Sequence, residues 1–191
     1  MTAKTRMASI LAWVINFDMP YCRLLFLVLL VLPWSVRAAD TEAASARFLR
    51  EAFTTPPQAA SLWLTAEMRP AIRRILDHDY PAARLRYWRL GQRTAWVLEE
   101  IGKEMPITAG IVVEDNHIER MRILVYRESR GGEVQTPAFT RQFADARLTT
   151  EQQLDRHIDG IAGATLSVRA LSRLARLALL LHQHAMHTEP K

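Results

Sequence analysis

The stretch D-G-I-A-G-A-T-L-S, residues Asp159 to Ser167, places a threonine on a turn of small residues directly before a long apolar-periodic segment. That segment, residues 166–184, carries apolar side chains at helical spacing, which predicts a long closing helix with one stripe packed on a sheet. The first N–H groups of a helix lack internal partners and carry the positive end of its dipole. The stretch therefore predicts an anion site, suited to a phosphate, at Thr165.

The residues around Thr165 have two interpretations. Gly163 and Ala164 keep large side chains away from the turn, and Leu166 and Ser167 open the predicted helix. In one interpretation these residues surround a phosphate carried by the threonine hydroxyl. In the other, Thr165 only caps the helix, because threonine is common at such a position.

This stretch resembles the flavin-attachment motif of the FMN-binding domain family, which reads aspartate, two variable residues, Ser or Thr, G-A-T, one variable residue, and Ser or Thr. Ala162 stands where the pattern has Ser or Thr, and the other fixed positions match. In the family a dedicated flavin transferase joins the FMN phosphate to the last threonine of the motif as a phosphoester. The resemblance therefore implies FMN attached covalently to Thr165, with Asp159 beside it. Relatives include periplasm-facing subunits of Rnf and Na⁺-translocating NADH:quinone reductase-type complexes.

Two further stretches agree with the family in order and spacing. Gly131 and Gly132 follow Glu128 in a glutamate-led turn, and the segment Phe139–Phe143 matches a Phe-x-x-Gln-Phe pattern. Glycines let a backbone approach a flat ring closely, and Glu128 is a candidate acceptor for a ring N–H or a ribityl hydroxyl. An ordinary hairpin and a solvated strand end are the simpler interpretations. The resemblance covers residues 61–181.

The remaining pattern predicts an α+β fold: N-terminal helices, an antiparallel sheet, and the long C-terminal helix packed on it. Helices are expected over residues 43–53 and 61–76, the second kinked at Pro70. Branched and aromatic residues bounded by turn signals predict four strands. These strands are Arg84–Leu90, Arg93–Ile101, Ile107–Val113 and Ile118–Tyr126, with alternation interrupted at Arg120, Arg122 and Val125.

The N-terminal segment, residues 1–38, has the pattern of a secretory signal peptide and is called the leader from here on. Residues 39–191 are then expected to form a single FMN-binding domain. An apolar run, Leu24 to Leu32, follows Arg23 and precedes a small-residue site that ends at Ala38. The run is shorter than the roughly 20 residues that span a bilayer. Residues 1–18 are interpreted as a misplaced start, with translation beginning at Met19. An uncleaved leader that tethers the domain to the membrane is the alternative.

Composition narrows the chemistry of the mature chain. The formal charge of the whole chain is +5, with 25 basic and 20 acidic residues. Four of the basic residues and one acidic residue precede residue 39, so the mature chain has a formal charge of +2. A charge this small gives no indication of nucleic-acid binding. The single cysteine, Cys22, also lies in the leader. An electron-transfer role would therefore require a bound organic cofactor.

Three groups of residues near these motifs are interpreted as structural. The tryptophans are assigned to the core rather than to flavin stacking: Trp63, Trp88 and Trp96. The histidines near the C-terminus are assigned to the surface rather than to a metal site: His182, His184 and His187. The arginines beside the apolar stripe are assigned to a solvated basic face, with docking to an acidic redox partner as the alternative: Arg169, Arg173 and Arg176.

These observations predict an exported flavoprotein that relays electrons at the periplasmic side of the inner membrane, either free in the periplasm or anchored to that membrane. Maturation would require a flavin transferase, and function a membrane-bound redox partner. Hydrolase and phosphate-loop motifs are absent from the sequence, which favours an electron-transfer subunit over a stand-alone enzyme. The alternatives are a reversible FMN binder or small flavin reductase, and a flavin-free exported interaction domain.

Overall fold

The computed structural model describes residues 40–187 of the chain. The predicted signal peptide, residues 1–38, and the alternative start at Met19 lie outside the described residues. Thr41–Lys191 forms one compact unit, which carries the sheet and the site discussed below. Residues 40–52 form a helix, called the N-terminal helix from here on.

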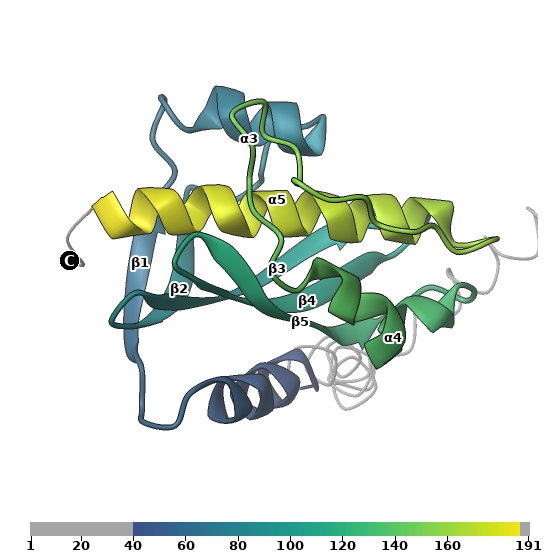
Figure 1. The fold of residues 1–191 in the computed structure, drawn as a ribbon, viewed down its shortest axis with the longest axis horizontal. Helices are drawn as coiled ribbons and strands as arrows, with labels where there is room; N and C mark the ends of the chain where they lie inside the picture. Colours follow the sequence, from purple (N-terminus) through teal and green to yellow (C-terminus); the bar gives the residue numbers. More distant parts are fainter. Residues whose placement is uncertain (1–39, 188–191) are drawn as a thin grey trace, which may run out of the picture. The chain divides into compact units, whose positions relative to one another are not determined.

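Five antiparallel strands form one sheet in which each strand pairs with its neighbours in sequence. They are β1 (Gln58–Trp63), β2 (Arg84–Leu90), β3 (Arg93–Ile101), β4 (Pro106–Glu114) and β5 (His117–Tyr126). Asp115 and Asn116 both have positive φ, 47° and 61°, which is the backbone that a tight two-residue hairpin needs. The sheet with its flanking helices confirms the α+β class (Figure 1).

The region between the N-terminal helix and β2 differs from the prediction of one kinked helix over residues 61–76. The chain forms β1 and then a separate helix, α3 (Arg69–Leu76). In β1, Ala60 and Leu62 are buried and their neighbours are more exposed, so the alternation has the period of a strand. β1 pairs with β2 along its whole length. The helical prediction was wrong because apolar residues two apart fit both periods over so short a segment.

Two helices cover opposite faces of the sheet (Figure 1). α5 (Thr165–His187) packs on the face that carries the odd-numbered residues of β4, such as Ile111. The N-terminal helix packs Phe48 and Ala52 against the other face, where Val112 points. Because successive side chains of a strand alternate between faces, β4 is buried on both. The predicted long C-terminal helix on the sheet is therefore confirmed.

Two register shifts in the β4–β5 pair account for the broken alternation of β5. One shift lies between Thr108 and Ala109, and the other between Val112 and Val113. Each leaves one residue of β5 without a partner on β4, Leu124 in the first case and Glu119 in the second. Such bulges locally change which side chains face the core, so a strict period-two pattern is not expected there.

The tryptophans divide between core and surface. Trp96 is fully buried and stacks on Tyr87 with 4.7 Å between ring centroids. Trp63, in contrast, is 59% exposed, with the Arg84 guanidinium 5.5 Å from its ring centroid. Assigning Trp63 to the core was wrong because it lies on the edge strand β1, where its neighbour Leu62 takes the core-facing position.

His182 is buried rather than on the surface, contrary to its assignment from sequence. The apolar stripe of α5 continues as far as Ala185, so the helix still faces the sheet at His182, which is 1% exposed. The Trp96 ring N–H donates to Thr94 Oγ1 at 2.9 Å, and Thr94 Oγ1 lies 2.8 Å from His182 Nδ1. Burial and the nearby charge of Arg89 lower the pKa of His182 to about 4, so the ring is neutral at pH 7.

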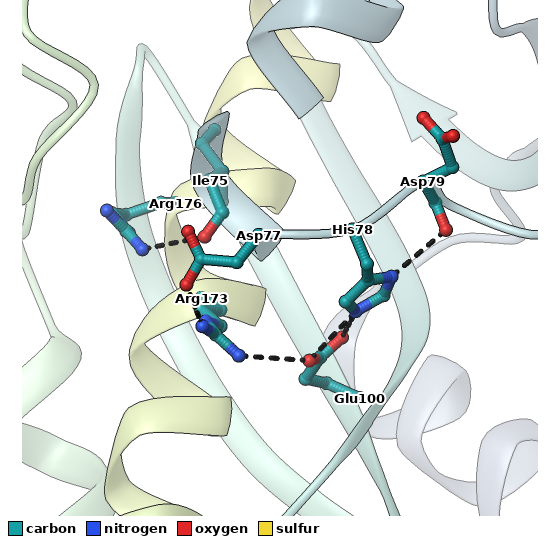
Figure 2. A network of polar contacts seen from close by, with 7 residues as sticks. All are labelled: Ile75, Asp77, His78, Asp79, Glu100, Arg173 and Arg176. Atoms are coloured by element: carbon teal, nitrogen blue, oxygen red, sulfur yellow. Dashed lines mark hydrogen bonds and ion pairs between the residues drawn. The ribbon is translucent and has the colours of Figure 1, made fainter. Parts of the chain in front are cut away.

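Two arginines of α5 belong to a polar network rather than to a solvated face (Figure 2). Arg173 bonds Asp77 and lies 3.5 Å from the buried carboxylate of Glu100, whose two oxygens are each 3.1 Å from His78 Nε2. Arg176 donates to the Ile75 carbonyl at 2.8 Å. These contacts tie the end of α3 to α5 and β3. The basic-face assignment is wrong for Arg173 and Arg176, whereas Arg169 is exposed as expected.

Gly110 sets the approach of the N-terminal helix to the sheet. A Cβ at Gly110 would lie 2.8 Å from three ring atoms of Phe48, closer than carbon atoms can approach. We expect Gly110→Ala to lower the free energy of unfolding by about 1–3 kcal/mol, the usual cost of overpacking. Urea denaturation measures the change, and Gly160→Ala is the matched control because nothing lies within 4 Å of its added methyl. Equal losses in the two variants would contradict this packing.

The buried His182 predicts a pH dependence of stability. Between its ordinary pKa of 6.5 and its lowered pKa of about 4, the unfolded chain binds a proton that the folded chain does not. Stability from this group is therefore complete above pH 6.5 and declines as the pH falls toward 4, by about 1 kcal/mol between pH 7 and 5.5. His78, whose pKa is raised, acts in the opposite direction.

Comparing the wild-type chain with His182→Asn in urea at pH 7 and 5.5 isolates the effect. The wild type should lose more stability on acidification than the variant does. An equal or smaller loss in the wild type would show that His182 titrates normally.

Candidate functional site

A hollow of about 510 Å³ lies where α5 begins, a size typical of small-molecule sites. Three segments distant in sequence form it: the turn after β3, the chain after β5, and the start of α5. Its lining residues are Lys103, Glu104, Glu128, Ser129, Arg130, Gly163, Ala164, Thr165, Leu166 and Ser167. The structure thus brings six of the nine predicted site residues to one hollow. Asp159, Gly131 and Gly132 are not among the lining residues.

Ala164, not Thr165, occupies the N-cap position of α5. The Ala164 carbonyl accepts the first intrahelical hydrogen bond, from the Val168 N–H at 3.0 Å, and Thr165 is the first helical residue. The methyl group of Ala164 offers no acceptor, and within residues 40–187 no side chain or helical carbonyl caps the N–H groups of Thr165, Leu166 and Ser167. The start of a 23-residue helix therefore presents uncapped donors at the hollow.

The Thr165 side chain is exposed, and its hydroxyl makes no hydrogen bond to any other residue that the structure describes. The interpretation of Thr165 as a simple helix cap does not fit this geometry, because a capping hydroxyl would accept from a backbone N–H of the first turn. Leu166 beside it is 42% exposed and supplies an apolar side chain to the hollow. The arrangement leaves the Thr165 hydroxyl accessible to a modifying group.

Gly131 brings the chain after β5 against the threonine turn. Its φ is +78°, in the left-handed region, and a Cβ there would lie 2.8 Å from Ala164 Cβ and 3.0 Å from the Tyr126 hydroxyl. Within the described chain, the close neighbour that requires a glycine is thus the turn before α5. The approach of a flat ring to these glycines stays a prediction. Gly132 begins the 3₁₀ helix η1 (Gly132–Gln135), where an added Cβ would meet only ordinary contact.

Glu128 holds the opposite wall of the hollow. Its Oε1 accepts from the backbone N–H groups of Lys103, Glu104 and Met105 at 2.5, 2.8 and 3.1 Å. Burial alone would raise the pKa of Glu128, but these three donors outweigh it, so that the pKa lies below the ordinary value. A Cβ on Gly102 would lie 2.7 Å from the same oxygen, so the turn needs glycine there. Oε1 is therefore committed to the backbone of the turn.

Asp159 is connected to the Phe-x-x-Gln-Phe segment. Gln142 Oε1 accepts from the Asp159 backbone N–H at 2.7 Å, while Phe139 and Phe143 are buried and meet edge to face with centroids 5.8 Å apart. These rings belong to α4 (Pro137–Thr140) and η2 (Arg141–Phe143). The Asp159 carboxylate is exposed and lies 3.8 Å from His157. The segment thus fixes the loop that leads to Thr165.

Sequence reasoning missed Tyr126, which bonds two lining residues of the hollow, and four of the lining residues themselves: Lys103, Glu104, Ser129 and Arg130. Lys103 and Arg130 add positive charge to the lining, and the Lys103–Glu104 ion pair, 3.4 Å long and exposed at both ends, leaves most of that charge available. Tyr126 donates its hydroxyl to the Arg130 carbonyl at 2.6 Å and lies 3.1 Å from Ser167 Oγ. The only sequence signal for Tyr126 was an aromatic residue at a strand end, which does not show which groups its hydroxyl meets.

Comparison with known proteins gives a family match over the part of the chain that forms the hollow. Residues 102–180 match the model of the FMN-binding domain family, a range that contains every lining residue of the hollow. No curated protein matches the chain. Within residues 40–187, no helix has the length and apolar character to cross a bilayer, and no group of three or more His, Cys, Asp or Glu side chains could hold a metal ion.

The carboxylate of Glu128 should protect the backbone amides of the turn that it binds from hydrogen exchange. We expect Glu128→Ala to speed hydrogen exchange of the Lys103, Glu104 and Met105 amides by about tenfold or more, because each loses its acceptor. Amide exchange followed by NMR reports this directly. Glu104→Ala is the control, since its carboxylate pairs only with the exposed Lys103 side chain. Unchanged exchange in Glu128→Ala would refute the assignment.

Proposed function

We propose that this protein carries FMN as a phosphoester on Thr165 and relays electrons outside the cytoplasm, a proposal supported by the match of residues 102–180 to the FMN-binding domain family. The observation that carries the attachment is an exposed, unpartnered hydroxyl on the first residue of a 23-residue helix whose N-cap has no side-chain acceptor. An anion held there would satisfy donors that the chain itself leaves open.

The residues around the hollow fit a flavin nucleotide. The uncapped N–H groups of the first turn of α5, together with Lys103 and Arg130, would hold the phosphate. Leu166 offers apolar contact, and Glu128 keeps the turn that carries Lys103 in place. The only cysteine, Cys22, lies in the leader, so electron transfer by the mature chain would require a bound organic cofactor. FMN would be that cofactor.

Attachment uses Thr165 Oγ1 as the nucleophile. Oγ1 forms a bond to the flavin-side phosphorus of a flavin dinucleotide, the phosphoanhydride bond breaks, and the nucleoside monophosphate leaves with the bonding electrons while the hydroxyl proton passes to a base of the transferase. The dinucleotide is required because direct condensation with FMN has no activated leaving group. The chain gains the mass of FMN minus water.

Ala162 departs from the attachment pattern without changing the hollow. It is exposed and is not among the lining residues, whereas the G-A-T residues line the hollow directly. A hydroxyl at this position would therefore face outward, where a transferase binds. The departure bears on how fast a transferase recognises the chain rather than on whether the phosphate site exists.

The leader supports the proposed location outside the cytoplasm. An apolar run with a small-residue site after it indicates export, and the mature charge of +2 leaves no strong field for nucleic acid. We propose maturation by a flavin transferase and electron exchange with a membrane-bound partner at the periplasmic side of the inner membrane. A phosphoester would prevent loss of the cofactor in a compartment where it cannot readily be replaced.

The experiment that tests the attachment compares Thr165→Val with Thr165→Ser after coexpression with a flavin transferase. Thr165→Val should remain folded but lack the added mass of FMN minus water, because its side chain has no hydroxyl. Thr165→Ser keeps a hydroxyl and should retain some of the modification. Intact mass of the denatured proteins provides the measurement.

Modified Thr165→Val would disprove attachment at this residue. Flavin released from the wild-type protein by denaturation would instead favour a reversible FMN binder. A colourless wild-type protein would favour the flavin-free interaction domain.

A further inference from the structure

Two walls of the hollow are joined through a tyrosine outside the attachment motif. Tyr126 ends β5, and its hydroxyl meets the Arg130 carbonyl on one wall and Ser167 Oγ on the other. We propose that Tyr126 is a positioning residue for attachment at Thr165, which holds the start of α5 in the geometry that the incoming phosphate requires. The inference rests on the proposed function and names a residue on which that function depends.

The direction of the two hydrogen bonds follows from chemistry. A carbonyl can only accept, so the single hydroxyl hydrogen of Tyr126 goes to the Arg130 carbonyl, 2.6 Å away. Ser167 must then donate to the Tyr126 oxygen across 3.1 Å. The two bonds form one chain from the helix to the loop, and removal of the tyrosine hydroxyl breaks both.

The tyrosine hydroxyl is held by a rigid element. Tyr126 pairs with Ile107 in the sheet, so the position of its ring is set by the β4–β5 ladder rather than by a loop. The Gly131–Ala164 contact lies beside it, since a Cβ on Gly131 would approach both Ala164 and the Tyr126 hydroxyl within 3.0 Å. A site supported by a strand is held more accurately than one supported by loops alone.

The same bond distinguishes the two hydroxyls at the start of α5. Ser167 is 4% exposed and its hydrogen is directed to Tyr126, whereas Thr165 is exposed and makes no hydrogen bond within the described chain. Both residues lie in the first turn, and their side chains differ only in this environment and in one methyl group. Tyr126 thus holds the first turn of α5 in place, with Ser167 turned inward and Thr165 exposed.

The test uses Tyr126→Phe, with Tyr80→Phe as the matched control. The Tyr80 hydroxyl also bonds the chain, at the backbone of Glu99, which is not a lining residue of the hollow. Tyr126 instead bonds Arg130 and Ser167, which both line it. Both variants therefore lose one hydrogen-bonded phenol hydroxyl, at different places. With a flavin transferase and a flavin dinucleotide, the initial rate of mass gain at low acceptor concentration gives kcat/KM for each protein.

We expect kcat/KM to fall about three- to tenfold in Tyr126→Phe and to stay near the wild-type value in Tyr80→Phe, consistent with the loss of one positioning hydrogen bond. Ser167→Ala should give a similar fall, and combining it with Tyr126→Phe should add little, because the two hydroxyls act as one unit. Equal kcat/KM in the wild type and Tyr126→Phe would overturn the proposal.

A second readout needs no flavin. Hydrogen exchange of the peptide spanning residues 157–169, measured by mass spectrometry on unmodified protein, should rise in Tyr126→Phe and not in Tyr80→Phe. An unchanged peptide would overturn the positioning role even if the wild-type chain were never modified. Failure of the wild type to gain mass, in contrast, counts against the proposed function alone, so the two ideas fail separately.

Discussion

The packing of α5 across the sheet is the constraint on which the site depends. Its buried stripe runs from Val168 to Ala185, so neither the rotation nor the position of the helix along the sheet is free. The first turn is therefore fixed at the end of the sheet where β5 finishes and where the loop after β3 turns back. Because Ala164 supplies no capping oxygen, that fixed turn keeps its N–H groups available. The same helix thus packs on the sheet and offers, at its first turn, N–H groups that can bind an anion.

Three sequence motifs become one structural unit around this helix start. The glycine turn reaches it through Gly131, which lies against Ala164, and the Phe-x-x-Gln-Phe segment holds the preceding loop through Gln142. Glu128 fixes the turn on the far wall by binding three backbone N–H groups. Each of these residues therefore makes a contact that holds one segment in place. Together the segments form a hollow with Thr165 accessible at its edge.

Sequence reasoning predicted most of the sheet and the closing helix, and it failed where local pattern and tertiary environment disagree. Strands β2 and β3 match their predicted bounds because turn residues delimit them. β1 was missed, since apolar residues two apart in a short segment fit either period. His182 and Arg173 were placed at the surface because residue type suggests exposure, whereas a 23-residue helix on a broad sheet buries His182 and leaves Arg173 half-buried. Tyr126 could not be found, because its partners come from distant parts of the chain.

The central claim is that Thr165 carries the flavin at the start of α5. Tandem mass spectrometry of the wild-type tryptic peptide spanning residues 157–169, taken from exported protein coexpressed with a flavin transferase and denatured before digestion, tests it most directly. Our account predicts an added mass of FMN minus water that fragmentation assigns to Thr165, together with flavin absorbance that remains with the peptide. An unmodified peptide, or an addition assigned to a different residue, would contradict the account.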